Sequence, residues 1–410
     1  MGSDNVIASI DIGSAKIRTV IWNFSEENGR DFNVLGVWIS TSNAIRKWNI
    51  LDMEEFKNNL DKSLEEAEKM AGEQISGVHL SLNSSSMEVV TSKWIIAVSG
   101  EEITEEDIDR VLDMAKNGVD LPNREILKVI PEYFVVDLED WVRNPLGMSA
   151  RKLEVVANIF SINKNILWNI TKAVADVWIE IYDIFPNLLA SPEWVLTKRQ
   201  KELGVVCIDI GAATTWVTIF EEGVLKFSSI IPIGWDSVTN DIALGIRTSI
   251  DVAEALKLDY SEVNLAEQKT KDKEISLNSI NRTEEWTVSS HYVNKIATAR
   301  YEEILMFVRD ELKRVGKDGM LPEWAMLVWG GSKQKWLLEL VKEILRLPAF
   351  VWIPVEKESL TETSISDPVF SGVIGSMILA NKYASSNRPF SLNISGFFTS
   401  IIKVFKKILP

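Results

Sequence analysis

An internal repeat of one short motif constrains the fold of this chain more than any other feature. Residues 6–13 read Val-Ile-Ala-Ser-Ile-Asp-Ile-Gly, and residues 204–211 read Gly-Val-Val-Cys-Ile-Asp-Ile-Gly. Each copy is an apolar run that ends in Asp-Ile-Gly, followed by small or hydroxylated residues and a second strand-like run. This pattern predicts strand, tight turn and strand. Two copies, each opening an α/β segment, predict two related domains.

The chemistry of such a turn favours an anion. Gly13 and Gly211 let the backbone approach a ligand closely and expose N–H groups to it. Asp11 and Asp209, at the strand ends, can hold Mg²⁺ through water, because Mg²⁺ keeps most of its hydration shell. One copy alone is also consistent with an ordinary hairpin turn. Two copies predict a nucleotide clamped between two domains and touched by both turns.

Composition excludes several other classes of protein. A net charge of -15 over 410 residues argues against nucleic acid as the main partner, because phosphates need a basic face. One cysteine and two histidines argue against a disulfide framework, a zinc cluster and His-based catalysis. We find no run of about 18 apolar residues and no signal peptide, so we expect a protein made in the cytoplasm.

Further motifs give the chain a family resemblance. The two turns resemble those of the actin, sugar-kinase and heat-shock-chaperone superfamily. The details resemble the bacterial cell-division family FtsA: Ile-Pro-Ile-Gly-Trp-Asp-Ser-Val-Thr-Asn-Asp-Ile-Ala at 231–243, Gly-Gly-Ser at 330–332, and Asp-Pro-Val-Phe-Ser-Gly at 367–372. These motifs follow the family's order across essentially the whole chain. The resemblance implies an α/β, two-domain actin-like fold with duplicated mixed β-sheets flanked by helices, a small inserted α+β subdomain and a C-terminal amphipathic helix.

The resemblance also implies a site for ATP and Mg²⁺. The nucleotide-binding residues that it implies are Asp11, Gly13, Ser14, Lys16, Asp209, Gly211, Thr214, Thr215, Asn240, Glu254, Lys257, Gly330, Gly331 and Ser332, with Asp11 and Asp209 also holding the metal through water. Family members use an acid and a base near the ribose and adenine, here Glu254 and Lys257. Their i,i+3 spacing alone favours a surface ion pair on a helix. Ala212 and Ala213 replace glycines that are usual in the family.

We expect the following division of the chain. The first actin-like domain comprises 1–82 and 164–197, the inserted FtsA-type subdomain 83–163, the second actin-like domain 198–235 and 319–380, a helical upper subdomain 236–318, a linker 381–395 and a membrane-binding helix 396–410. In the inserted subdomain we expect strands at Glu88–Val98, Ile126–Leu138 and Leu153–Ile162, and a helix that begins with a capping motif at Thr104. Lys172–Leu196 reads as mostly helical.

The last fifteen residues separate into two faces on a helical wheel. Phe397, Phe398, Ile401, Ile402, Val404, Phe405, Ile408 and Leu409 form one arc, and Thr399, Ser400, Lys403, Lys406 and Lys407 form the other. A helix this short needs a surface on which to fold. Packing on its own domain is one possibility. The polar linker and the three lysines favour an anionic membrane, with membrane contacts from Phe397, Phe398, Ile401, Ile402, Lys403, Phe405, Lys406, Lys407, Ile408 and Leu409.

Tryptophan is unusually frequent, and its positions are unusual too. The chain has 15 Trp and 21 Gly, whereas average usage predicts about 29 Gly. By resemblance, Trp48, Trp141, Trp235, Trp329 and Trp336 fall where the FtsA family prefers glycine, and we extend this to Trp38, Trp94 and Trp324. Our hypothesis is that the gene reads UGA as glycine, and that these letters come from a code that reads it as tryptophan. The alternative is a genuinely Trp-rich protein.

The function that follows from the resemblance is an FtsA-like, ATP-binding actin homologue. It would polymerise, contact the tubulin-like ring protein FtsZ, bind other division proteins through the inserted subdomain, and attach the ring to the cytoplasmic face of an anionic membrane at the division site. We identify no strong general base, so any ATP hydrolysis should be slow. A pilus-assembly actin-like protein is the first alternative, and a sugar or acetate kinase of the same superfamily is the second.

Overall fold

The computed structural model describes residues 6–24, 32–42, 44–46, 49–263, 272–328, 330, 334–352, 365 and 367–385. The predicted membrane helix 396–410, and Trp48, Trp329, Gly331 and Ser332, lie outside these residues.

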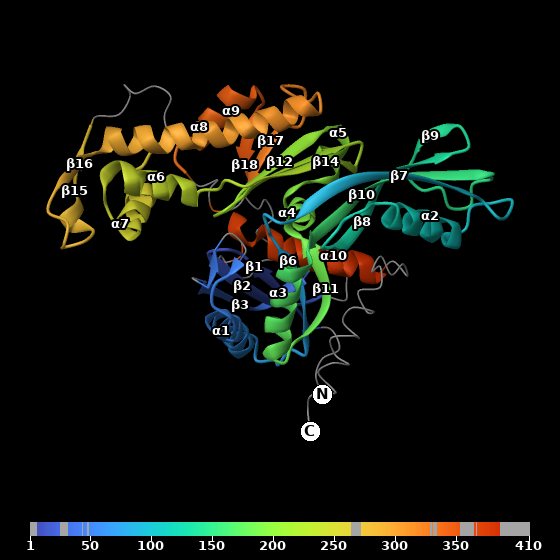
Figure 1. The fold of residues 1–410 in the computed structure, drawn as a ribbon, viewed down its shortest axis with the longest axis horizontal. Coiled ribbons are helices and arrows are strands. Elements are labelled where there is room, and N and C mark those ends of the chain that lie inside the picture. Colours follow the sequence, from blue (N-terminus) through green and yellow to red (C-terminus); the bar gives the residue numbers. More distant parts are fainter. Residues whose placement is uncertain are drawn as a thin grey trace.

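Two five-stranded sheets with the same topology form the centre of the molecule (Figure 1). In the first sheet, β1 (Val6–Ile12) pairs antiparallel with β2 (Lys16–Phe24), which pairs with β3 (Phe32–Thr41), while β6 (Gly77–Leu82) and β11 (Glu180–Pro186) extend the other side in parallel. The second sheet repeats this order with β12 (Val205–Ile210), β13 (Thr215–Glu221), β14 (Val224–Ile231), β17 (Ala325–Val328) and β18 (Ala349–Val351). The predicted duplicated actin-like α/β fold is therefore confirmed.

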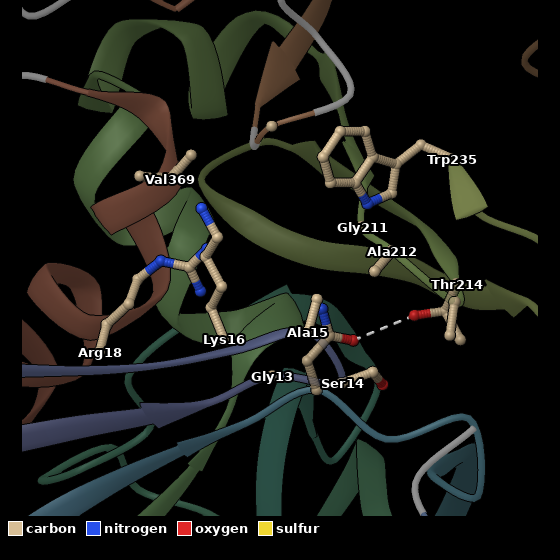
Figure 2. A pocket seen from close by; sticks show the side chains of 13 residues that line it. Gly13, Ser14, Ala15, Lys16, Arg18, Gly211, Ala212, Thr214, Trp235 and Val369 are labelled. Atoms are coloured by element: carbon tan, nitrogen blue, oxygen red, sulfur yellow. Dashed lines mark hydrogen bonds between the residues drawn. The ribbon is translucent and has the colours of Figure 1, made fainter. Parts of the chain in front are cut away.

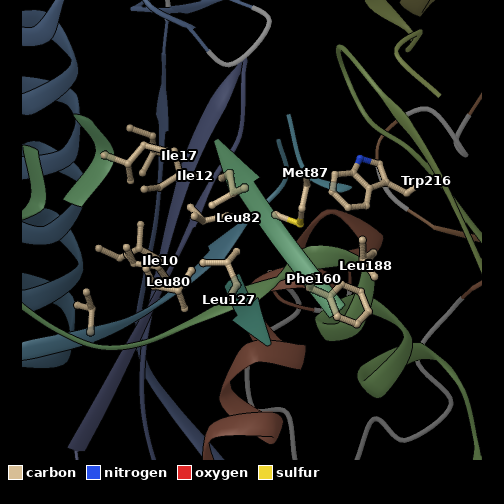
Figure 3. Close-up of a cluster of buried hydrophobic side chains, with 14 of the residues drawn as sticks. Ile10, Ile12, Ile17, Leu80, Leu82, Met87, Leu127, Phe160, Leu188 and Trp216 are labelled. Atoms are coloured by element: carbon tan, nitrogen blue, oxygen red, sulfur yellow. The ribbon is translucent and has the colours of Figure 1, made fainter. Parts of the chain in front are cut away.

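Burial explains why the repeated motif forms the central strand of each sheet. All six residues of β12 are buried, as are the last five of β1, and continuous apolar runs are typical of strands covered on both faces. The core around the first sheet extends beyond that sheet. Figure 3 shows Ile10 and Leu80 on one side of this cluster and Trp216 of β13 on the other. Apolar packing therefore joins the two halves beneath the site described below.

The inserted subdomain is a four-stranded sheet covered by one helix. Its strands are β7 (Glu88–Ala97), β8 (Arg124–Val136), β9 (Glu139–Val142) and β10 (Lys152–Asn163), in the order β7-β10-β8-β9. The helix α2 (Glu105–Asn117) begins at Thr104, whose hydroxyl accepts the Asp107 N–H while the Asp107 side chain accepts the Thr104 N–H. The three predicted strands and the predicted capping box are confirmed.

Three helices of the first half pack against the first sheet. They are α1 (Met53–Ala71), α3 (Lys164–Asp176) and α4 (Asn187–Val195), with a small ladder of β4 (Ile45–Arg46) and β5 (Asn49–Ile50). The short helix α5 (Lys198–Leu203) instead contacts β13 of the second sheet. The expectation that Lys172–Leu196 is mostly helical is wrong in its middle. Glu180–Pro186 forms β11, which pairs in parallel with β6 and supplies the edge of the sheet. A short strand between two helices has too few residues for its period to be read from sequence.

The second half carries a helical region between β14 and β17. It contains α6 (Asp236–Ile246), α7 (Ile250–Ala255), a π-helical turn (Leu256–Tyr260), a ladder of β15 (Glu274–Ser276) and β16 (Thr287–Ser289), and α8 (Ser290–Arg314). After these come α9 (Leu337–Leu345) and α10 (Ser371–Ser385), and α10 packs mainly against α4. Within the described ranges, no helix combines the length and the apolar character needed to cross a membrane.

Candidate nucleotide site

The two repeated turns have the same local geometry. In the first turn, the Gly13 N–H donates to the Lys16 carbonyl at 3.0 Å, and in the second the Gly211 N–H donates to the Thr214 carbonyl at 2.9 Å. A Cβ on Gly13 would lie 2.9 Å from that carbonyl oxygen, and a Cβ on Gly211 would lie 3.2 Å from its counterpart. Both turns therefore favour glycine for the closeness of their own backbone.

Both turns face one pocket between the domains (Figure 2). The pocket has about 550 Å³ of empty space, open solvent at its mouth included. The first hairpin contributes Gly13, Ser14, Ala15, Lys16 and Arg18, and the second contributes Gly211, Ala212, Ala213 and Thr214. Asn83, Trp235, Gly330 and Val369 complete the lining. Residues from both halves of the chain thus surround one space.

Two buried aspartates lie behind the turns. Burial raises the pKa of Asp11 to about 6, although the Arg18 guanidinium opposes this shift by donating to Asp11 Oδ2 at 3.0 Å. The pKa of Asp209 rises to about 8, first because its carboxyl is buried and second because Asp11 adds a like charge. Asn187 donates to Asp209 Oδ2 at 3.2 Å and holds its orientation. The charge of Asp11 thus opposes ionisation of Asp209.

The same aspartates meet the requirements of a hydrated cation. Within the described part of the chain, Oδ1 of Asp11 and Oδ1 of Asp209 are buried without a hydrogen-bond partner. Leaving a buried acceptor unpaired costs about 1–3 kcal/mol. A ligand that supplies donors to these two oxygens would therefore be stabilising. Mg²⁺ with its water shell would supply such donors and would neutralise two like charges. The donor set thus fits a metal held through water by Asp11 and Asp209.

Glu254 and Lys257 form a pair that is less exposed than their spacing suggests. Lys257 Nζ lies 2.6 Å from Glu254 Oε2, and its side chain is only 1% exposed. Burial lowers the pKa of Lys257, and the Glu254 carboxylate opposes the shift. The Thr239 hydroxyl donates to Glu254 Oε2 at 2.5 Å and accepts from Lys257 Nζ at 2.6 Å. For Lys257 the surface-pair interpretation is wrong. Its ammonium lies 3.8 Å from the centre of the ring of Trp235, which lines the pocket, whereas Lys257 itself does not.

The structure brings most, but not all, of the predicted residues to this pocket. Gly13, Ser14, Lys16, Gly211, Thr214 and Gly330 line it, and Asp11 and Asp209 lie directly behind it. Thr215 does not line the pocket, because its hydroxyl faces the opposite way and donates to the Ile233 carbonyl at 2.9 Å. Asn240 does not line it either, because it is exposed on α6.

Several residues at the site carry no signal in the sequence. Asn83 and Arg18 line the pocket, and Asn187 and Ser191 contact Asp209 from α4. Asn83 and Thr214 are 131 positions apart and meet only because the two domains face each other. A single asparagine after an apolar run cannot be distinguished in sequence from a residue of an ordinary turn.

Four tryptophans adopt a backbone conformation that favours glycine. Trp141, Trp178, Trp324 and Trp336 have φ angles of 66°, 63°, 77° and 64°. They make up four of the nine described non-glycine residues with positive φ, a region where Asn and Asp are the usual exceptions and bulky side chains are outliers. Trp141, Trp324 and Trp336 were among the positions that the glycine hypothesis names, and Trp178 is a new one. Trp235 has an ordinary φ of -68°.

Comparison with known proteins identifies relatives over nearly the whole chain. A family model described as "Cell division protein FtsA" matches residues 206–375, and a model of the "SHS2 domain inserted in FTSA" matches residues 84–161. The cell division protein FtsA of Pseudomonas aeruginosa is 30% identical over 395 residues, which cover 96% of this chain and 94% of that protein. FtsA of Bacillus subtilis is 30% identical over 349 residues, 84% of this chain and 78% of its own length.

Solved structures agree on the fold. A PilM–PilN type IV pilus biogenesis complex aligns with a TM-score of 0.65 at 13% identity, over 92% of this chain and 98% of that chain. MreB 5 of Spiroplasma citri bound to AMPPNP aligns with a TM-score of 0.55, also at 13% identity, over 93% and 98% of the two chains. At this identity the similarity establishes the actin-like fold and nothing more.

Proposed function

The chain belongs to the FtsA family of bacterial cell division proteins, and from this membership we propose that it is an ATP-binding actin homologue that attaches the division ring to the membrane. In this proposal ATP and Mg²⁺ hold the two domains together and the closed form assembles into filaments. The filaments bind the tubulin-like ring protein FtsZ, and the C-terminal tail anchors them to the cytoplasmic face of the membrane. The inserted subdomain contacts neighbouring subunits and other division proteins.

The observation that carries nucleotide binding is the pair of matching turns at one pocket. Phosphate oxygens would accept from backbone N–H groups of both turns and from the side chains of Ser14 and Lys16. Bound Mg²⁺ would neutralise phosphate charge, and Asp11 and Asp209 would hold it through water. Glu254 and Lys257 would act one layer further out, because Trp235, which Lys257 contacts, lines the pocket and they do not. This chain's own residues would thus orient the nucleotide from two domains at once.

Membrane attachment rests on the pattern of the tail. Three lysines near an anionic surface contribute on the order of 1 kcal/mol each, and the aromatic and aliphatic face adds insertion. One tail would bind reversibly, whereas a filament that presents many tails would bind firmly. A pilus-assembly role has support only from similarity of fold. The basic amphipathic tail and the FtsA relatives favour cell division instead.

Sedimentation with lipid vesicles tests this function. The full chain and a variant without residues 396–410 are mixed with ATP, Mg²⁺ and vesicles that contain an anionic lipid, and then pelleted. We expect the full chain to pellet with the vesicles and the truncated chain to stay in solution while still binding nucleotide. A matched pair refines the test: Phe405→Asp puts a charge on the apolar face and should abolish pelleting, whereas Ser400→Asp puts the same charge on the polar face and should only weaken it. Equal pelleting of the full and truncated chains would refute the tether.

A further inference from the structure

We propose that Asn83 binds the terminal phosphate of the nucleotide and passes the presence of that phosphate to the inserted subdomain. This inference rests on the proposed ATP binding and adds a residue and a route to it. Asn83 directly follows β6 of the first domain, is only 5% exposed, and lines the pocket. The Thr214 hydroxyl of the second turn donates to Asn83 Oδ1 at 3.3 Å. Asn83 is therefore a contact between the two domains inside the pocket itself.

A chain of hydrogen bonds fixes which end of the Asn83 amide is available. The indole Nε1–H of Trp216 can only donate, and it donates to Thr214 Oγ1 at 2.8 Å. Because Thr214 Oγ1 accepts from Trp216, its own proton is free to go to Asn83 Oδ1. The Asn83 NH₂ group is then the remaining end of the chain, and it is the end that can donate to a ligand in the pocket.

The position of that NH₂ group points to a phosphate. A Cβ on Gly211 would lie 3.5 Å from Asn83 Nδ2, so the amide nitrogen lies against the second turn. Asn83 also shares the pocket lining with Gly13 and Ser14 of the first turn. The space between two facing phosphate turns is where the end of a phosphate chain would lie. An uncharged donor there can bind a phosphate oxygen without adding to the positive charge of Lys16 and Arg18.

The same residue lies at the entrance to the inserted subdomain. Ser84 and Ser86 follow it, and the chain then enters β7. Arg124 joins this entering segment to the returning one, because its Nη2 donates to the Ser86 carbonyl at 2.6 Å and to the Ser161 carbonyl at 3.0 Å. Its Nε also donates to Ser161 Oγ at 2.8 Å. One guanidinium thus holds together the entering segment at Ser86 and the returning segment at Ser161, which we call the neck of the inserted subdomain. A movement of Asn83 would reach the sheet β7-β10-β8-β9 within a few residues.

Asn83→Ala tests the proposal, with Asn158→Ala as the matched control. Asn158 is equally buried and also bridges two parts of the molecule, because its Nδ2 donates to the Leu225 carbonyl at 3.1 Å, but it does not line the pocket. Affinities for ATP and ADP are measured by displacement of a fluorescent nucleotide, and hydrogen exchange follows residues 84–97 and 152–163. A hydrogen bond to a charged group supports a loss of about 10-fold or more.

We expect Asn83→Ala to weaken ATP about 10-fold, to weaken ADP less than about threefold, and to remove the extra protection that ATP gives to the neck. Asn158→Ala should leave the ratio of ATP to ADP affinity unchanged. Thr214→Val removes the same interdomain bond from the other side and serves if Asn83→Ala does not fold. A wild-type ratio in the Asn83→Ala protein would overturn this proposal alone. If the wild-type chain binds neither nucleotide, the proposed function fails instead.

Discussion

Replacing Trp178 with glycine should make the protein more stable, although the substitution removes a large aromatic side chain. Trp178 follows the end of α3, which the structure places at Asp176, and its N–H donates to the Ala175 carbonyl at 3.0 Å. Its φ is 63° and its side chain is 82% exposed. A residue in the left-handed conformation just after a helix is most often glycine. The backbone here has the geometry of a glycine cap and carries an indole instead.

The size of the effect follows from two opposing terms. The left-handed conformation costs a residue with a Cβ about 1–2 kcal/mol. Glycine offsets part of this gain in stability, because the greater conformational entropy of its unfolded chain lowers the free energy of unfolding by about 0.4–1 kcal/mol. The indole contributes little burial, since most of it is in solvent. We therefore expect Trp178→Gly to raise the free energy of unfolding by about 0.5–1 kcal/mol.

Urea unfolding followed by circular dichroism measures this change, and Trp168→Gly is the matched control. Trp168 lies inside the same helix, is 40% exposed, and has helical backbone angles. Glycine inside a helix lowers stability by up to about 1 kcal/mol, and lost burial adds to this. The midpoint should thus rise for Trp178→Gly and fall for Trp168→Gly, with the slope unchanged. Two falling midpoints would refute the explanation from backbone strain.

Three further predictions follow from the site and the composition. Both aspartates have folded pKa values, about 6 for Asp11 and about 8 for Asp209, above the usual 3.8, so the folded state binds more protons than the unfolded state. Stability of the nucleotide-free protein should therefore fall as pH rises from about 5 to 9, which urea unfolding at several pH values measures. Over the same range the affinity for Mg²⁺ should rise, because the metal displaces those protons, and titration calorimetry measures this. Thr239→Val should destabilise the fold by about 1–3 kcal/mol, because it takes an acceptor from the buried Lys257 ammonium, and an unchanged urea midpoint would contradict this. Peptide mapping by mass spectrometry of protein from the native organism should show glycine in place of tryptophan at the four positions with positive φ, and an intact mass that requires all 15 indoles would refute the reassigned codon.

The parts of the fold that could be predicted are those whose signal is local. The turns at Gly13 and Gly211, the strands of the inserted subdomain and the capping box at Thr104 each lie within a short stretch of sequence. Their duplication and order then supplied the resemblance. The strand β11 was missed because seven residues between two helices do not reveal their period.

The parts of the site that could not be predicted depend on contacts between distant residues. Asn83 meets Thr214, and Asn187 meets Asp209, only after the sheets have formed and the domains face each other. Thr215 and Asn240 were placed at the site by family order, yet one side chain turns toward Ile233 and the other toward solvent. Position along a motif specifies which turn a residue belongs to, but the alternation of a strand and the face of a helix decide where its side chain points.

The tryptophans do not form one class, and this bears directly on the nucleotide pocket. Trp22 and Trp216 are fully buried in strands, and removing such an indole costs about 3–5 kcal/mol. A reassigned UGA codon leaves UGG tryptophans in place, so true core indoles and misread glycines can coexist in one chain. Our hypothesis places Trp235 in the second group for a different reason. Its backbone tolerates any residue, but its indole fills part of the pocket lining, and within the described residues its buried Nε1 has no acceptor. Glycine there would remove an unpaired donor and enlarge the space above Lys257, so nucleotide binding should be stronger in the native gene product than in the chain written with tryptophan.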